Sequence, residues 1–178
     1  WGRICNNILI WDYVIQFKNL VSPFPNLRVL QPNIQYLVKN GCVAMFPQGN
    51  RETAGEFAEL RAYMLAKLLW NPDVDVDSVM DDFLEGYYGD AAPFIRRYID
   101  VMHDALEASG AGLNIFGSPI QARETYLAPD LLDEYEALFD QAEAAVAGDA
   151  AVLARVRQAR LPLDYAVLEQ AKQDPVGE

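Results

Sequence analysis

The residues with the clearest potential for chemistry follow a short apolar run near the start of the chain. The run at 8–11 leads directly into Trp11-Asp12-Tyr13, which joins two aromatic rings to a carboxylate. Aromatic rings cover the apolar C–H faces of a sugar, and a carboxylate accepts hydrogen bonds from its hydroxyl groups. We therefore predict that Trp11 and Tyr13 supply stacking area, and that Asp12 accepts hydroxyl hydrogen bonds or holds a basic side chain.

A second polar segment follows the apolar run at 42–46. Gln48-Gly49-Asn50 offers side-chain amides that both donate and accept hydrogen bonds. Glu52 is the following glutamate that is best placed to reach a pocket. We predict that Gln48, Asn50 and Glu52 join the first segment in binding a sugar substrate.

Ordinary structural roles explain the same residues about equally well. Trp11 could be a core aromatic residue, Asp12 could cap the end of a strand, and Gly49-Asn50 could form a turn. Both segments are too short to be specific by themselves.

The elements that must position these residues alternate between strand and helix. The runs at 8–11 and 42–46 are continuously apolar, as in strands buried on both faces of a parallel sheet. A proline-rich loop at 22–26 follows the first run, and helices are predicted to begin at Pro32 and at about Gly55. This order is typical of a parallel sheet or barrel, in which ligands bind at the carboxyl ends of the strands.

The rest of the chain has a helical pattern after a division near residue 72. The segment 110–119 is rich in glycine and is predicted to be irregular. Helices are predicted at 74–88, at 91–108, at 129–147 and from 148 onward, the last broken or kinked by Pro162.

Charge and hydropathy exclude several classes of protein. The net charge is −12, which opposes tight binding to nucleic acid or anionic lipid. Residues 1–72 carry a net charge of +3 and residues 73–178 a net charge of −15, which indicates solvated helix faces in the second part. No apolar run approaches the roughly 20 residues of a membrane span.

The cysteines and the single histidine favour structural roles. Cys5 and Cys42 lie in apolar surroundings without metal-site spacing, so we predict two buried free thiols. His103 lies in a helical pattern away from a plausible nucleophile and is interpreted as a packing or surface residue.

Carboxylates give neither a metal site nor a complete catalytic pair. The cluster around Asp75 and Asp77 lacks the calcium-loop pattern and is better explained as a helix cap and a first-turn charge. We predict no metal and no cofactor. Glycoside hydrolysis generally needs two carboxyl groups, and only Asp12 lies at a strand end, while Glu59 is expected to pair with Arg61 or another neighbour. The catalytic residues therefore stay unassigned.

Several ordered motifs together resemble one bacterial family, that of domain of unknown function 4838. The resemblance covers roughly residues 8–110. It rests on Trp11-Asp12-Tyr13 and on the segments at 23–27, 30–34, 46–50, 59–72 and 82–89.

This resemblance implies an α/β protein. Residues 1–72 would form the last strands and helices of a TIM-type (β/α) barrel related to hexosaminidases and α-glucuronidases. Residues 73–178 would form an all-α region. Because the chain begins at Trp1, we interpret it as a C-terminal fragment whose partners are an oligosaccharide or glycan and an upstream half of the barrel. The parent would be secreted, periplasmic or on the cell surface of a bacterium. Many relatives are expected to carry Glu where this chain has Pro47, which favours binding or an altered substrate.

Three functions remain open at this stage. In the first, the parent hydrolyses glycosidic bonds and this chain supplies part of the sugar pocket. In the second, the same surface binds a glycan without catalysis. In the third, the helical region serves packing or dimerisation without a ligand.

Overall fold

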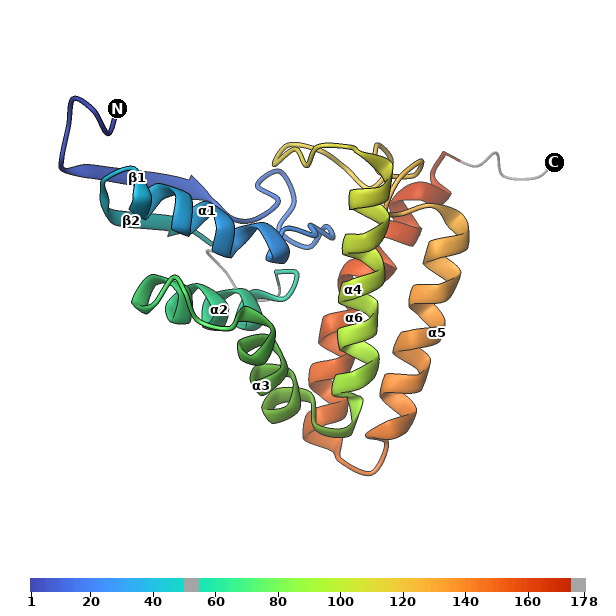
Figure 1. The fold of residues 1–178 in the computed structure, drawn as a ribbon. Coiled ribbons are helices and arrows are strands. Elements are labelled where there is room, and N and C mark those ends of the chain that lie inside the picture. The colour runs from blue at the N-terminus through green and yellow to red at the C-terminus, as the bar shows by residue number, and fades with distance from the viewer. Residues whose placement is uncertain (50–54, 174–178) are drawn as a thin grey trace.

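The structure is a computed structural model that describes residues 1–49 and 55–173. Its sheet and helix α1 lie on one side, α4, α5 and α6 form a helical layer on the other, and α2 and α3 connect them (Figure 1). The elements in chain order are β1 (Ile8–Tyr13), α1 (Leu27–Lys39), β2 (Cys42–Gln48), α2 (Ala58–Trp70), α3 (Val76–Tyr88), the 3-10 helix η1 (Gly89–Ala91), α4 (Ala92–Ser109), α5 (Pro129–Ala145) and α6 (Ala150–Ala171).

The two apolar runs form a parallel pair of strands, as predicted. Trp11 lies opposite Phe46, and Tyr13 lies opposite Gln48. Because side chains alternate along a strand, these four residues share one face of the sheet. The opposite face carries Asp12 and is half-buried, whereas Trp11, Tyr13 and Phe46 are exposed.

The prediction of a TIM-type barrel is wrong. In the described residues the sheet has two strands, and the other regular elements are helical. Closure of a barrel requires a ring of strands, which two strands cannot provide. The alternation of strand and helix signals correctly indicated one parallel β–α–β unit, but it did not indicate how many further strands would join that unit.

The core lies mainly among the helices. Aromatic and aliphatic side chains from α2 to α6 are fully enclosed there, and Tyr98 packs edge to face against Tyr135 and Phe139 at centroid distances of 5.1 and 4.8 Å. These rings join α4 to α5. Burial of such large rings is a dominant stabilising contribution in a core.

Helix α1 begins five residues before the expected Pro32, which lies inside it. The early start is possible because the first backbone N–H, that of Leu27, finds a partner on another helix, Nε2 of His103 at 3.0 Å. The helix ends as predicted, since Gly41 adopts φ +87°, a left-handed conformation that suits glycine.

Helix α6 runs without interruption through Pro162, which was expected to break or kink it. Pro162 and Leu163 are buried against the neighbouring helices. Tertiary packing therefore outweighs the local cost of a proline within a helix.

Other expectations about local roles had mixed outcomes. Cys5 and Cys42 are free, as predicted, but Cys5 is exposed and Cys42 is only half-buried. Asp75 caps α3 as predicted, accepting from the Ser78 N–H at 3.2 Å.

No helix in the described part of the chain is long and apolar enough to cross a membrane.

Candidate functional site

The carboxyl ends of β1 and β2 bring Trp11 and Gln48 into contact. The Nε1–H of Trp11 donates to Oε1 of Gln48 over 2.7 Å. The indole ring also packs edge to face on Phe46, with centroids 5.0 Å apart, yet 62% of Trp11 is exposed. The sheet thus presents a fixed aromatic surface next to an amide.

A row of three aromatic rings continues from the end of β1 to the loop after α4. Tyr13 packs edge to face on Phe17 at 5.1 Å, and Phe17 packs on Phe116 at 6.2 Å. The backbone N–H groups of Phe17 and Lys18 both donate to the carbonyl of Ile115, at 2.7 and 3.0 Å. These bonds hold the 110–118 loop against the strand end.

Asp12 lies on the other face of the sheet from Trp11 and Tyr13. Its register partner is Pro47, and its Oδ1 accepts from the backbone N–H of Tyr13 at 2.9 Å. One carboxylate oxygen is therefore engaged with the backbone at the strand end. Asn50 and Glu52, the other two predicted binding residues, lie outside the described residues.

The ion pair expected for Glu59 forms instead between Arg61 and Glu56. Arg61 is 3% exposed and Glu56 is 5% exposed, with Nη2 and Oε2 separated by 2.6 Å. Burial raises the pKa of Glu56, and the guanidinium of Arg61 opposes that rise. Arg61 also donates to Oδ1 of Asn26 at 3.3 Å, and Asn26 donates to the carbonyl of Val14 at 2.9 Å. This network fixes the chain between β1 and α1.

Gln16 joins the strand end to a small polar pocket. Its Nε2 donates to the carbonyl of Gly117 at 2.6 Å, and its Oε1 accepts from the N–H of Asn19 at 2.9 Å. The pocket has a volume of about 100 Å³. Its polar lining comes from the loop after β1 and from the segment 110–126, namely Gln16, Ser22, Asn114, Ser118, Gln121, Thr125 and Tyr126.

Sequence reasoning missed Phe17, Phe46, Phe116 and the polar pocket. Phe46 could have been found, because strand alternation places it on the same face as Gln48. Phe17 and Phe116 carry no local signal, since they meet only when the loop after α4 folds back on the end of β1.

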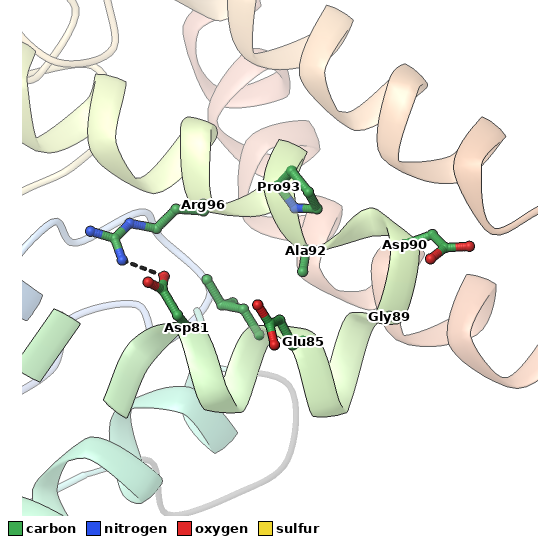
Figure 2. Close-up of a pocket in the computed structure, with 8 residues that line it drawn as sticks. Asp81, Glu85, Gly89, Asp90, Ala92, Pro93 and Arg96 are labelled. Carbon is green, nitrogen blue, oxygen red and sulfur yellow. Dashed lines mark hydrogen bonds and ion pairs between the residues drawn. The ribbon is translucent and has the colours of Figure 1, made fainter. Parts of the chain in front are cut away.

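A second cavity, of about 320 Å³, lies between α3 and α4. Figure 2 shows Arg96 bonded to Asp81 at one end of this cavity, Glu85 along it and Asp90 at the other end. All three guanidinium nitrogens of Arg96 contact carboxylates: Nη1 meets Asp81 at 2.6 Å, Nη2 meets Asp77 at 2.8 Å and Nε meets Asp100 at 3.0 Å. This arrangement ties α3 to α4. Within the described ranges, no group of three or more His, Cys, Asp or Glu side chains could hold a metal ion.

The fold and its surface define a mixed α/β protein, in which a parallel β–α–β unit packs with helices and exposes aromatic rings at its strand ends. The chain belongs to the family described as Domain of unknown function (DUF4838), whose sequence model matches residues 1–100. The match includes both strands and the first half of α4. No curated protein and no solved structure matches the chain.

Proposed function

We propose that this protein binds carbohydrate through the exposed surface formed by Trp11, Tyr13 and Gln48. One observation carries the proposal: an exposed indole ring is fixed by a 2.7 Å hydrogen bond to a side-chain amide. A sugar needs this combination, because a ring face contacts its C–H groups while an adjacent polar group bonds its hydroxyls.

The orientation of the Gln48 amide follows from the chemistry of its partner. An indole nitrogen only donates, so Gln48 must present its oxygen to Trp11, which leaves the NH₂ group directed elsewhere. Among the described residues, no group accepts from this NH₂, and it is therefore available to a hydroxyl oxygen. Because Trp11 is already held in place, a ligand loses less side-chain entropy on binding than it would with a mobile ring.

Binding is favoured over hydrolysis by the state of two acidic residues. Asp12 accepts from the backbone on the opposite face of the sheet, and Glu56 is buried against Arg61. A retaining or inverting glycosidase requires two carboxyl groups that flank the scissile bond. Glu56 is paired with Arg61 instead, and Asp12 lies on the face opposite Trp11 with one oxygen bonded to the backbone.

Glycan-array binding followed by calorimetric titration tests the proposal. The wild-type protein should bind members of an array of neutral and acidic glycans from monosaccharides to hexasaccharides. Trp11→Ala should weaken the affinity for the strongest binder at least tenfold, and Gln48→Ala should weaken it about threefold to tenfold, as expected for loss of a stacking face and of one hydrogen bond.

Trp70→Ala is the matched control, because Trp70 is also a highly exposed tryptophan (91%) but lies at the end of α2. It should bind like the wild type. Absence of binding to the whole array, or equal affinities for Trp11→Ala and the wild type, would remove this surface as a carbohydrate site.

A further inference from the structure

The polar pocket contains hydroxyl groups that have no protein partner among the described residues. Tyr126 lines the pocket, and no described group bonds its hydroxyl; the same holds for the side chain of Ser22, a residue that is 3% exposed. Ser22 is buried and Tyr126 is half-buried, and polar groups that line a pocket normally bond to protein, water or ligand. Burial raises the pKa of Tyr126 to about 12, so its hydroxyl keeps its proton at neutral pH and is able to donate.

The pocket is large enough for part of a ligand. Its volume of about 100 Å³ exceeds the roughly 30 Å³ that one water molecule occupies in the liquid. Several waters, or one polar substituent of a larger molecule, therefore fit. Displacing ordered water increases affinity only when the ligand reproduces its hydrogen bonds, which requires a hydroxyl-bearing or amide-bearing group.

The lining is uncharged. Hydroxyl, amide and backbone groups supply its polarity, and no lining residue among those described is ionised at neutral pH. An anionic group would lose its hydration here without a compensating cation, which is costly. The pocket therefore discriminates in favour of neutral ligands.

The pocket and the aromatic row are built from the same two chain segments. Gln16 lies between Tyr13 and Phe17 in the sequence and lines the pocket, and Oδ1 of Asn114, another lining residue, accepts from the N–H of Phe116 at 2.9 Å. The segment after β1 and the loop after α4 thus supply both the aromatic row and the lining of the pocket.

We propose that this pocket is a second subsite, which binds one substituent of an uncharged oligosaccharide whose other end lies on Trp11 and Gln48. This inference rests on the proposed carbohydrate binding. The ligand is consequently longer than one sugar, and its recognition involves the segment 110–126 as well as the strand ends.

Two mild substitutions test the subsite. Tyr126→Phe removes a hydroxyl that has no protein partner within residues 1–49 and 55–173, and Gln121→Ala removes the amide of an exposed residue at the pocket. The matched controls are Tyr36→Phe on the exposed side of α1 and Gln141→Ala on α5. Calorimetry would use the strongest neutral oligosaccharide from the array, its successively truncated forms down to the monosaccharide, and an oligosaccharide of equal length that contains uronic acids.

Each pocket variant should lose at least threefold in affinity for the longest neutral ligand and change less than twofold for the shortest ligand that still binds. Trp11→Ala should lose affinity for both, and the uronic-acid oligosaccharide should bind at least tenfold more weakly than the neutral one. Pocket variants that bind every length like the wild type, while Trp11→Ala is impaired, would overturn the second subsite and leave the proposed function intact. Equal binding of the acidic oligosaccharide would overturn the neutral specificity, and absence of all glycan binding would overturn both proposals.

Discussion

The backbone N–H of Leu27 donates to Nε2 of His103, 76 residues further along the chain, over 3.0 Å. The Nδ1 atom of the same ring lies 2.7 Å from the carbonyl of Ile99. A carbonyl only accepts, so Nδ1 carries the hydrogen and Nε2 presents its lone pair to Leu27. The neutral imidazole thereby caps α1 from α4, in place of the side chain of Asn26, which makes no cap bond.

This arrangement makes stability depend on pH through His103. Burial lowers the pKa of His103, with a further lowering by Arg28 and an opposing effect of Asp100 and Glu107. The unfolded chain therefore takes up a proton before the folded chain does. The contribution of His103 to the free energy of unfolding should be constant above the ordinary histidine pKa of about 6.5, and it should fall as the pH drops below that value.

Urea unfolding at pH 7.5 and pH 5.5 measures this effect. His103→Gln should be less stable than the wild type by about 1 kcal/mol at pH 7.5, because one or both hydrogen bonds are impaired. Its loss of stability between the two pH values should be about 1 kcal/mol smaller than that of the wild type, since the carboxylates titrate in both proteins. Equal losses would exclude His103 as the titrating group.

The buried pair of Arg61 and Glu56 should be far more important for stability than an exposed pair. Arg61→Ala leaves a buried carboxylate without its cation and should cost about 3–5 kcal/mol in urea unfolding. Arg97→Ala is the control, because Arg97 is 3.7 Å from Glu134 at the surface and should cost less than about 1 kcal/mol. Similar costs for the two variants would contradict a central role for the buried network.

Two core tyrosines should respond oppositely to loss of their hydroxyl groups. The hydroxyl of Tyr98 is fully buried and, among the described residues, has no partner, whereas that of Tyr135 donates to the carbonyl of Tyr126 at 3.0 Å. Tyr98→Phe should therefore raise the free energy of unfolding by about 1 kcal/mol, and Tyr135→Phe should lower it by about 1 kcal/mol. Thermal unfolding followed by circular dichroism would show shifts in Tm of opposite sign. A lower Tm for Tyr98→Phe would mean that an ordered water bonds this hydroxyl.

Arg96 should stabilise the contact of α3 with α4 in a salt-dependent way. Its three carboxylate partners raise its pKa despite burial, so the guanidinium stays charged. Arg96→Ala should lower the free energy of unfolding by about 1–2 kcal/mol at low ionic strength. The loss should be clearly smaller in about 0.5 M NaCl, which screens charges more strongly than physiological salt does.

Arg157→Ala is the matched surface control. Arg157 is 65% exposed and bonds Glu143 at 3.0 Å, so its removal should cost less than half as much as removal of Arg96. A cost for Arg96→Ala that does not change with salt would point to lost packing of its aliphatic stem in place of lost ion pairs.

The sequence by itself determined the local elements and the types of side chain at the strand ends. Continuous apolar runs specified both strands, and the glycines at 41 and 89 ended their helices where expected. These features depend on neighbouring residues only, so their physical causes can be read directly along the chain. The sequence therefore predicted Trp11 and Gln48 at the ends of two strands, and the pairing of β1 with β2 brings them into contact.

Tertiary structure decided what depends on distant residues. The start of α1 required His103, the continuity of α6 required a buried environment for Pro162, and the partner of Arg61 proved to be Glu56 because both are enclosed together. The aromatic row and the polar pocket likewise exist only because the loop after α4 bonds to the end of β1. Such contacts arise from the balance of burial and hydrogen bonding over the whole fold, which local propensity does not encode.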